Sequence, residues 1–226
     1  MLDVSRHFFT KQEVKRFIDL MAEYKYNVFH WHLSDDQGWR VEIKSLPRLT
    51  DVGAWRAPRV GNWWEREPQS VTDSLTYGGF YTQDDIREVV EYARERFITV
   101  VPEIDVPGHS MALLTAYPEI SCTGGPFHVN VGNTFYTKEE NSLCVGKEKT
   151  FAILDMIFDE LVDLFPSSYI HIGGDECYKG FWAKCPDCRA RMSSKQLQNV
   201  EELQSYFVKR VASHMPVSYT HLRAHE

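Results

Sequence analysis

The sequence lacks any long apolar run and any excess of basic residues. No stretch of about 18 apolar residues occurs among its 226 residues, so no segment is predicted to cross a membrane. Acidic residues outnumber lysine and arginine by 32 to 25, which gives a formal net charge of −7. Surfaces that hold nucleic acid through phosphate contacts are usually basic, so no nucleic-acid partner is expected.

Cysteines are few, and no leader segment is visible. The five cysteines are scattered over residues 122–188, an odd number without the spacing of a disulfide framework. The chain begins Met-Leu-Asp-Val, without the basic and apolar regions of a signal peptide, and it starts inside an expected strand. These observations leave the redox compartment open.

Cys185-Pro-Asp-Cys188 is a lone C-x-x-C pair, with Cys144 and Cys177 as further thiols. A structural zinc site usually takes its four ligands in paired spacing, and a redox motif usually opens a helix directly after a strand. Neither pattern is recognisable around this pair. The prediction is therefore a loop with free thiols or one local disulfide.

Short apolar strands alternate with amphipathic helices along the chain. The predicted strands are residues 2–9, 26–33, 98–105 and 169–172. Capping-box spacing begins the first predicted helix, and Thr82-Gln-Asp-Asp85 begins the second. Apolar residues at helical intervals mark all four helices, at 10–22, 82–93, 151–165 and 200–211. The stretch 46–80 carries three tryptophans and is predicted to be an ordered insertion, because it is too aromatic for a disordered linker.

This alternation predicts parallel strands joined by right-handed crossovers. In each unit the charged residues follow the strand, as in a (β/α)8 TIM barrel, where the loops after the strands carry the chemistry. A doubly wound sheet is the alternative, but no glycine-rich phosphate-binding sequence follows the first strand. The predicted fold is α/β, roughly the first four β/α units of a TIM barrel.

A closed TIM barrel needs eight units, and four are recognisable here. Residues 1–215 are predicted to form a partial catalytic barrel domain. Residues 216–226 turn polar and lose the alternation of a strand, so they are predicted to be a non-native or unstructured tail after a truncation. The alternative is a loop with a natural terminus, which would leave an exposed parallel edge.

Charged side chains gather at the predicted ends of four strands. They are Arg6 and His7; Asp35, Asp36 and Arg40, with the aromatic Trp39 beside them; Glu103, Asp105 and His109; and Asp175 and Glu176. Adjacent parallel strands lie about 5 Å apart, so these groups are expected to converge on one mouth.

The segment Tyr-Ile-His-Ile-Gly-Gly-Asp-Glu at 169–176 is central to this set. Asp175 and Glu176 follow a buried strand and a glycine turn, and side chains adjacent in extended backbone point in different directions. Glycoside hydrolysis needs a carboxylic acid that stays protonated to donate to the leaving oxygen, and Glu176 beside Asp175 is a candidate. Arg6 is a suitable donor fork for sugar hydroxyls. A solvated acidic turn is the alternative.

A metal-dependent hydrolase on the same barrel is a further alternative. His30 and His32 share a strand face, and further ligands could come from Asp35, Asp36, His109 and Asp175. No His-x-His pair reaches the loop side cleanly, and strand histidines are often packed or hydrogen-bonded in the core. The prediction is therefore no catalytic metal and no cofactor.

Four segments resemble the catalytic barrel of the family 20 β-N-acetylhexosaminidases. They are residues 1–8 with Ser-Arg-His, 30–40 with Asp-Asp-Gln-Gly-Trp-Arg, 102–109 with Pro-Gly-His, and 171–176 with Gly-Gly-Asp-Glu. The motifs occur in order and extend over residues 1 to about 213, and as a set they are highly specific. The resemblance implies an exo-acting enzyme that removes terminal N-acetylglucosamine or N-acetylgalactosamine from a small carbohydrate or glycan.

The resemblance also implies a retaining, substrate-assisted mechanism. In that family the 2-acetamido oxygen of the substrate attacks the anomeric carbon and forms an oxazolinium intermediate. Glu176 would be the general acid and then the base that activates water, and Asp175 would hold the acetamido N–H. Arg6 would bind hydroxyls on the far side of the terminal sugar. Asp35 would couple through His109 to Glu176.

The family's later strands supply tryptophans and a tyrosine that enclose the acetamido group, and these have no counterpart after Pro216. A chain of residues 1–226 alone is therefore expected to show little or no turnover of an aryl β-N-acetylglucosaminide. A noncatalytic sugar-binding relative is the alternative, against which the intact Asp175-Glu176 pair argues. Bacterial members are often exported, which implies a periplasmic or secreted location. No oligomeric state is predicted.

Overall fold

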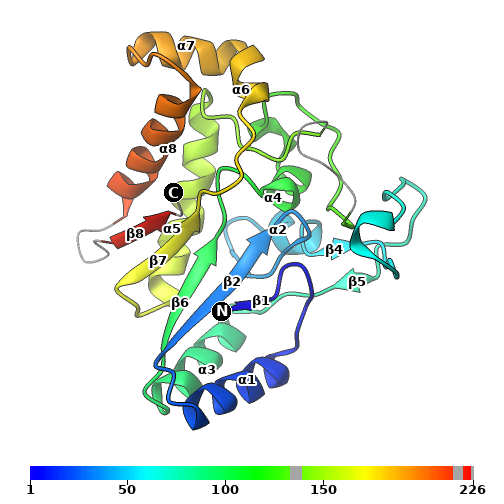
Figure 1. Ribbon diagram of the computed structural model, residues 1–226, viewed down its shortest axis with the longest axis vertical. Coiled ribbons are helices and arrows are strands. Elements are labelled where there is room, and N and C mark those ends of the chain that lie inside the picture. The colour runs from blue at the N-terminus through cyan, green and yellow to red at the C-terminus, as the bar shows by residue number, and fades with distance from the viewer. Residues whose placement is uncertain (133–138, 216–220, 225–226) are drawn as a thin grey trace.

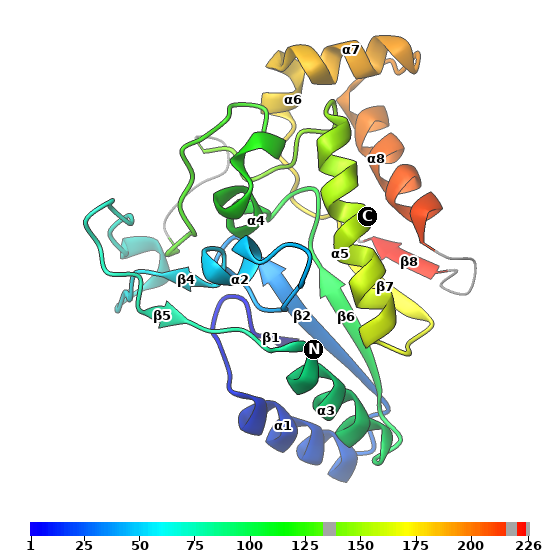
Figure 2. The ribbon, with the colours of Figure 1, turned by 180° about the vertical axis from the view of Figure 1, so that it is seen from behind.

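A parallel sheet forms the centre of the protein (Figures 1 and 2). The computed structural model describes residues 1–132, 139–215 and 221–224. The strands lie in the order β1-β2-β6-β7-β8, each parallel to its neighbours. Their bounds are β1 Leu2–Asp3, β2 Val28–Asp35, β6 Thr99–Ile104, β7 Tyr169–Gly173 and β8 His221–Ala224. A short strand β3, Gly38–Trp39, returns antiparallel to β2.

Four long helices connect these strands and line one side of the sheet, as Figure 2 shows. They are α1 Lys11–Glu23, α3 Gln83–Arg94, α5 Glu148–Leu164 and α8 Val200–His214. Helix α1 packs beside α3, α3 beside α5, and α5 beside α8, so the helices follow the strands in chain order. This arrangement is a partial (β/α)8 barrel of four β/α units, as predicted.

Local sequence explains where the first two crossover helices begin. Thr10 and Thr82 are N-cap residues, and each accepts a hydrogen bond from the backbone N–H three residues on, of Glu13 and Asp85. The carboxylates of Glu13 and Asp85 reach back to the N-cap backbone, so the predicted capping box at Thr10 is confirmed and Thr82 forms a second one. Such a cap stabilises a helix by about 1 kcal/mol.

The side chains of β2 alternate between the helices and the opposite face of the sheet. Phe29, Trp31 and Leu33 are fully buried, and Phe29 contacts Phe17 of α1. The intervening residues, His30 and His32, contact Glu103 on the neighbouring strand β6. The helix-facing side therefore supplies the apolar core, while the other side carries polar groups.

The insertion between β3 and α3 is ordered, as predicted. It contains α2 Arg48–Asp51, the 3-10 helix η1 Trp63–Glu65, and the antiparallel pair β4 Trp55–Arg56 and β5 Tyr77–Gly78. Arg40, which is fully buried, joins this insertion to the barrel by donating hydrogen bonds to Ala54 and Gly79 on one side and to Val4 and Ser5 on the other.

Two predicted loops contain short helices, so those predictions are wrong in detail. The loop after β6 carries α4 Met111–Ala116 and η2 Pro118–Ile120, and the loop after β7 carries α6 Gly180–Lys184 and α7 Pro186–Ser194. Both α6 and α7 lie beyond the carboxyl ends of the strands (Figure 1). Each has a single buried residue, Trp182 in α6 and Cys188 in α7, so neither shows the repeating apolar stripe that predicts a helix.

The prediction that residues 216–226 are unstructured is wrong for the four residues of β8, while their being non-native stays a prediction. Residues His221–Ala224 form β8, which pairs in parallel with β7. Strand pairing uses backbone groups and does not require alternating side chains, so the apolar pattern was a poor guide there. The rest of that predicted tail lies outside the described residues. In the described part of the chain, no helix has the length and apolar character needed to span a membrane.

Candidate active site

The carboxyl ends of the parallel strands carry the predicted site residues. Asp35 is the last residue of β2, and Asp175 and Glu176 follow β7. His109 lies in the loop after β6, and Arg6 follows β1. Because the strands are parallel, these residues all lie at one edge of the sheet.

His109 is the centre of this cluster. Its Nδ1 lies 3.2 Å from Asp35 Oδ1 and 3.4 Å from Asp36 Oδ2. On the other side of the ring, Nε2 lies 3.4 Å from Glu176 Oε2 and 4.0 Å from Asp175 Oδ2. The imidazole therefore connects a buried carboxylate pair to the more exposed pair at the mouth, and Asp35, His109 and Glu176 lie in the order that the resemblance implied.

The carboxylates on the buried side control the charge of this histidine. Burial alone would lower the pKa of His109, but hydrogen bonds with Asp35 and Asp36 outweigh it and raise that pKa to about 12. Burial alone would raise the pKa of Asp35, yet its contacts with His109 and His32 hold that pKa below its usual range. At neutral pH the imidazolium has an N–H on both ring nitrogens, one directed to the buried carboxylates and one to the carboxylates at the mouth.

Arg6 closes the other side of Asp35. Its Nη2 lies 2.6 Å from Asp35 Oδ2, and its Nη1 lies 2.9 Å from Asp3 Oδ2. Burial disfavours the guanidinium charge, but Asp35 and Asp3 outweigh it and raise the pKa of Arg6. The Arg6 side chain is 36% exposed while that of Asp35 is fully buried, so Arg6 lies between the buried network and the solvent.

A histidine network lies behind the site, on the side of the sheet away from the helices. Glu103 contacts Nε2 of His30 at 2.6 Å, Nδ1 of His32 at 2.6 Å and Nδ1 of His171 at 2.9 Å. Burial alone would lower the pKa of His32, but hydrogen bonds with Asp35 and Glu103 raise it to about 10. The strand histidines thus have carboxylate partners in the core. This is the hydrogen-bonded arrangement that the sequence analysis gave as the alternative to metal ligands.

Asp105 belongs to the cluster although the sequence did not assign it a role. Its Oδ1 accepts a hydrogen bond from the backbone N–H of Gly174 at 3.2 Å. A Cβ at Gly173 would lie 1.8 Å from the same oxygen, so only glycine permits this approach. Burial and the charge of Asp35 raise the pKa of Asp105 to about 8, so the group is largely protonated at neutral pH.

Asp105→Asn is expected to remove a pH dependence of stability. A carboxyl whose folded-state pKa lies above its unfolded value binds its proton more tightly in the folded state. Folding is therefore destabilised as the pH rises from about 4 to about 8, by about 1.4 kcal/mol per pH unit at most. Urea unfolding at several pH values should show this slope in the unmodified chain and not in Asp105→Asn.

Asp163→Asn is the matched control, because Asp163 is exposed on α5. That substitution should leave the slope unchanged. The assignment of a proton to Asp105 would be wrong if both variants followed the same pH dependence as the unmodified chain.

Three residues predicted at strand ends lie outside the cluster. His7 is exposed, and its Nδ1 contacts the Tyr77 hydroxyl at 2.7 Å. Arg40 donates to backbone carbonyls of the core, and Trp39 Nε1 donates to Val41 O at 2.6 Å. All three follow strands as predicted, but the side chains of Trp39 and Arg40 are buried in the core and that of His7 lies at the surface.

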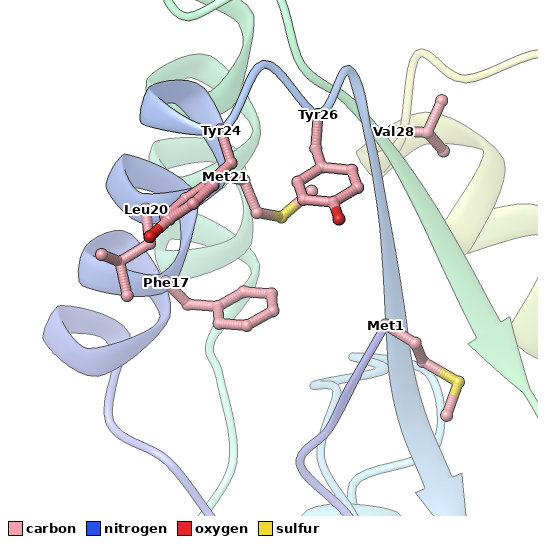
Figure 3. Close-up of a pocket in the computed structure, with 7 residues that line it drawn as sticks. All are labelled: Met1, Phe17, Leu20, Met21, Tyr24, Tyr26 and Val28. Atoms are coloured by element: carbon pink, nitrogen blue, oxygen red, sulfur yellow. The ribbon is translucent and has the colours of Figure 1, made fainter.

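A hollow of about 360 Å³ lies at the opposite end of β2 (Figure 3). Its lining residues, whose side chains are all uncharged, are Met1, Phe17, Leu20, Met21, Tyr24, Tyr26 and Val28. It lies near the amino end of β2, while Asp35 is at the carboxyl end. The amino ends of barrel strands serve stability rather than catalysis, so we assign no chemistry to this hollow.

The family described as "Glycosyl hydrolase family 20, catalytic domain" matches residues 1–222. The chain belongs to this family. Among curated family 20 relatives, the β-hexosaminidase of Porphyromonas gingivalis is 45% identical over 93% of the chain, and that of Vibrio furnissii is 46% identical over 92%. The matched parts make up 25% and 33% of those two proteins, so the chain spans a third of their length or less.

Solved structures of family 20 agree with this assignment. The exo β-N-acetylglucosaminidase of Vibrio harveyi, in complex with N-acetylglucosamine, superposes with a TM-score of 0.82 and 39% identity. That match covers 99% of this chain and 34% of the Vibrio harveyi chain. A β-N-acetylhexosaminidase from Bacteroides fragilis superposes with a TM-score of 0.78 and 40% identity, over 95% of this chain and 38% of its own.

Proposed function

We propose that this chain supplies the acid-bearing part of an exo-acting β-N-acetylhexosaminidase, which removes terminal N-acetylglucosamine or N-acetylgalactosamine with retention of configuration. The contact of His109 with Asp35 on one side and Glu176 on the other is the observation that carries the proposal. It joins a solvent-accessible carboxyl, where a sugar can bind, to a buried group that fixes the histidine.

In the proposed reaction, Glu176 in its acid form gives a proton to the glycosidic oxygen. The 2-acetamido oxygen of the substrate attacks the anomeric carbon as the leaving group departs, and Asp175 orients the acetamido group through its N–H. Glu176, now a carboxylate, takes a proton from water as that water opens the oxazolinium ring. The side chains of Asp175 and Glu176 are 45% and 61% exposed at the mouth, which supports direct contact of both with substrate.

Arg6 and the buried groups have supporting roles in this proposal. The exposed part of the Arg6 guanidinium would donate to sugar hydroxyls while Asp35 holds its other edge. His109 is a positioning residue, since it reaches the reaction only through Glu176. The family resemblance also supports a periplasmic or secreted location for the whole enzyme.

The test uses an enzyme in which residues 1–215 lie within a complete family 20 barrel, here called the whole-barrel enzyme. It should hydrolyse aryl β-N-acetylglucosaminides or β-N-acetylgalactosaminides and release the β-anomer first, as NMR of the early product would show. The matching aryl β-glucoside should be a very poor substrate, because it has no acetamido oxygen to attack the anomeric carbon. Equal hydrolysis of the glucoside, or release of the α-anomer, would contradict the proposal.

A further inference from the structure

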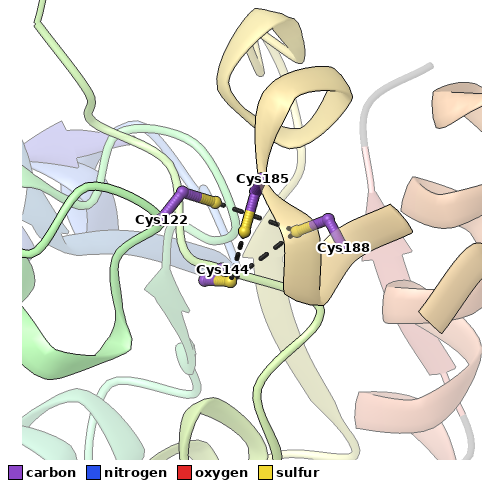
Figure 4. A group of neighbouring side chains, drawn as sticks. All are labelled: Cys122, Cys144, Cys185 and Cys188. Atoms are coloured by element: carbon purple, nitrogen blue, oxygen red, sulfur yellow. Dashed lines mark hydrogen bonds between the residues drawn. The ribbon is translucent and has the colours of Figure 1, made fainter. Parts of the chain in front are cut away.

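Four cysteine sulfurs lie together beyond the carboxyl ends of the strands (Figure 4). Cys122 and Cys144 come from the loop after β6, and Cys185 and Cys188 come from the start of α7. All four Sγ atoms lie within 4.8 Å of one another. The closest separations are 3.6 Å for Cys144 and Cys188, 3.7 Å for Cys144 and Cys185, and 3.8 Å for Cys122 and Cys188.

These distances fit a metal site better than disulfides. A disulfide requires an S–S distance of about 2 Å, and all five cysteines are free. Four thiolates around Zn²⁺, with Zn–S bonds of about 2.3 Å, form a tetrahedron whose edges are about 3.8 Å. We propose that Cys122, Cys144, Cys185 and Cys188 form a structural tetrathiolate site for one Zn²⁺ ion.

The surroundings of the four sulfurs are those of a closed site. Cys144 and Cys188 are fully buried, Cys185 is 5% exposed and Cys122 is half-buried, so water reaches the cluster mainly from the side of Cys122. Cys185 is the N-cap of α7 and Cys188 lies in its first turn, where the helix dipole favours thiolate. The four thiols would lose their protons on binding Zn²⁺, which leaves a net charge of about −2 on the centre.

Gly146 allows the two cysteine-bearing segments to meet. A Cβ on this residue would lie 2.2 Å from the carbonyl carbon of Asp187 and 2.4 Å from the backbone nitrogen of Cys188. The backbone near Cys144 therefore packs directly against the start of α7. On the other side, Lys147 donates to the carbonyl oxygens of Glu119 and Ser121 and so holds the segment that carries Cys122.

Zinc at this position would tie together the two loops that carry the active-site residues. Leu143, next to Cys144, donates its N–H to Pro107 O at 2.8 Å, and Ser110 donates to Asn141 O at 2.8 Å. These two bonds flank His109. Trp182 of α6, three residues before Cys185, donates to Leu143 O at 2.9 Å. The metal would thus support the position of His109 relative to Glu176 without contacting substrate.

The first measurement is the metal content of the chain of residues 1–226, purified with reductant and without chelator. About one zinc ion per chain is expected from elemental analysis. Replacement by Co²⁺ should produce the visible bands of tetrahedral cobalt and the near-ultraviolet absorption of thiolate ligation. Both readouts use the unmodified chain, so they do not depend on whether a variant folds.

Cys144→Ser and Cys188→Ser should lose the stoichiometric zinc, while Cys177→Ser should keep it. Cys177 is a matched control because it is also buried but is not one of the four clustered cysteines. A zinc chelator should lower the thermal unfolding temperature of the unmodified chain and leave that of metal-free Cys144→Ser unchanged.

Several outcomes would overturn the proposal. These are a chain that stays metal-free when refolded with Zn²⁺, a mass that shows disulfides among the four cysteines under reducing purification, and equal loss of zinc in Cys177→Ser. Iron in place of zinc would overturn the identity of the ion. None of these measurements uses glycosidase turnover, so their failure is distinguishable from failure of the proposed function.

Discussion

Glu176→Gln in the whole-barrel enzyme is expected to lower kcat/KM by about 10²–10⁴-fold for substrates with poor leaving groups. The amide has nearly the shape of the carboxyl but neither gives a proton to the leaving oxygen nor takes one from water. Aryl substrates with very good leaving groups should be affected less in the first step, because they need little protonation. Steady-state kinetics with leaving groups of graded pKa would measure this difference.

Glu201→Gln is the matched control for that substitution. Glu201 is 70% exposed on its side chain and pairs with Lys179, away from the His109 contacts. Its replacement should leave kcat/KM within about twofold of the parent. Product binding should survive in Glu176→Gln, as calorimetry with N-acetylglucosamine would show. Full activity in Glu176→Gln would contradict the role of Glu176 as the acid. Sugar binding without any turnover in the parent enzyme would instead favour a noncatalytic relative.

Arg40→Met is expected to produce the largest loss of stability. The Arg40 guanidinium uses all five of its N–H groups in hydrogen bonds to backbone carbonyls. Its acceptors are the backbone carbonyls of Val4, Ser5, Gln37, Ala54 and Gly79, at 2.6–3.3 Å. Methionine would remove this donor from all five oxygens, although Ala54 O still accepts from the backbone N–H of Gly79 at 3.3 Å. Each buried oxygen left unsatisfied costs about 1–3 kcal/mol, and we expect a loss of about 4 kcal/mol or more.

Urea unfolding of the whole-barrel enzyme and the variant would measure this loss. Arg87→Met is the control, because Arg87 is exposed on α3 and its ion pair with Asp84 is at the surface. That change should cost less than about 1 kcal/mol. The loss of stability in Arg40→Lys should lie between those of Arg40→Met and Arg87→Met, because an ammonium has three N–H groups. A stability of Arg40→Met close to that of the parent would show that relaxation or water satisfies the carbonyls.

Much of the fold was predictable because its signals are local. The capping boxes at Thr10 and Thr82 and the apolar stripes of the four long helices require no knowledge of distant contacts. The short helices α4, α6 and α7 were missed because five to nine residues hold too few turns to show a period. Strand β8 was missed because backbone pairing to β7 creates it.

The candidate site shows the same division. Arg6, Asp35, His109, Asp175 and Glu176 were located from motifs at strand ends, and the structure brings them together, while their chemical roles stay predictions. The protonation of Asp105 depends on burial and on the charge of Asp35, which the sequence does not reveal. The cysteine cluster was missed because Cys122 and Cys144 lie far along the chain from the C-x-x-C pair.

The partners of Arg40 also bear on how this part of the barrel can change over evolution or in the laboratory. All five are main-chain oxygens, which every amino acid possesses. Mutations that alter the side chains around Arg40 therefore do not delete its acceptors, whereas any change of Arg40 itself deletes every bond at once. A saturation library should show stronger intolerance at position 40 than at position 37, where a substitution changes a buried side chain but keeps the carbonyl that accepts from Arg40.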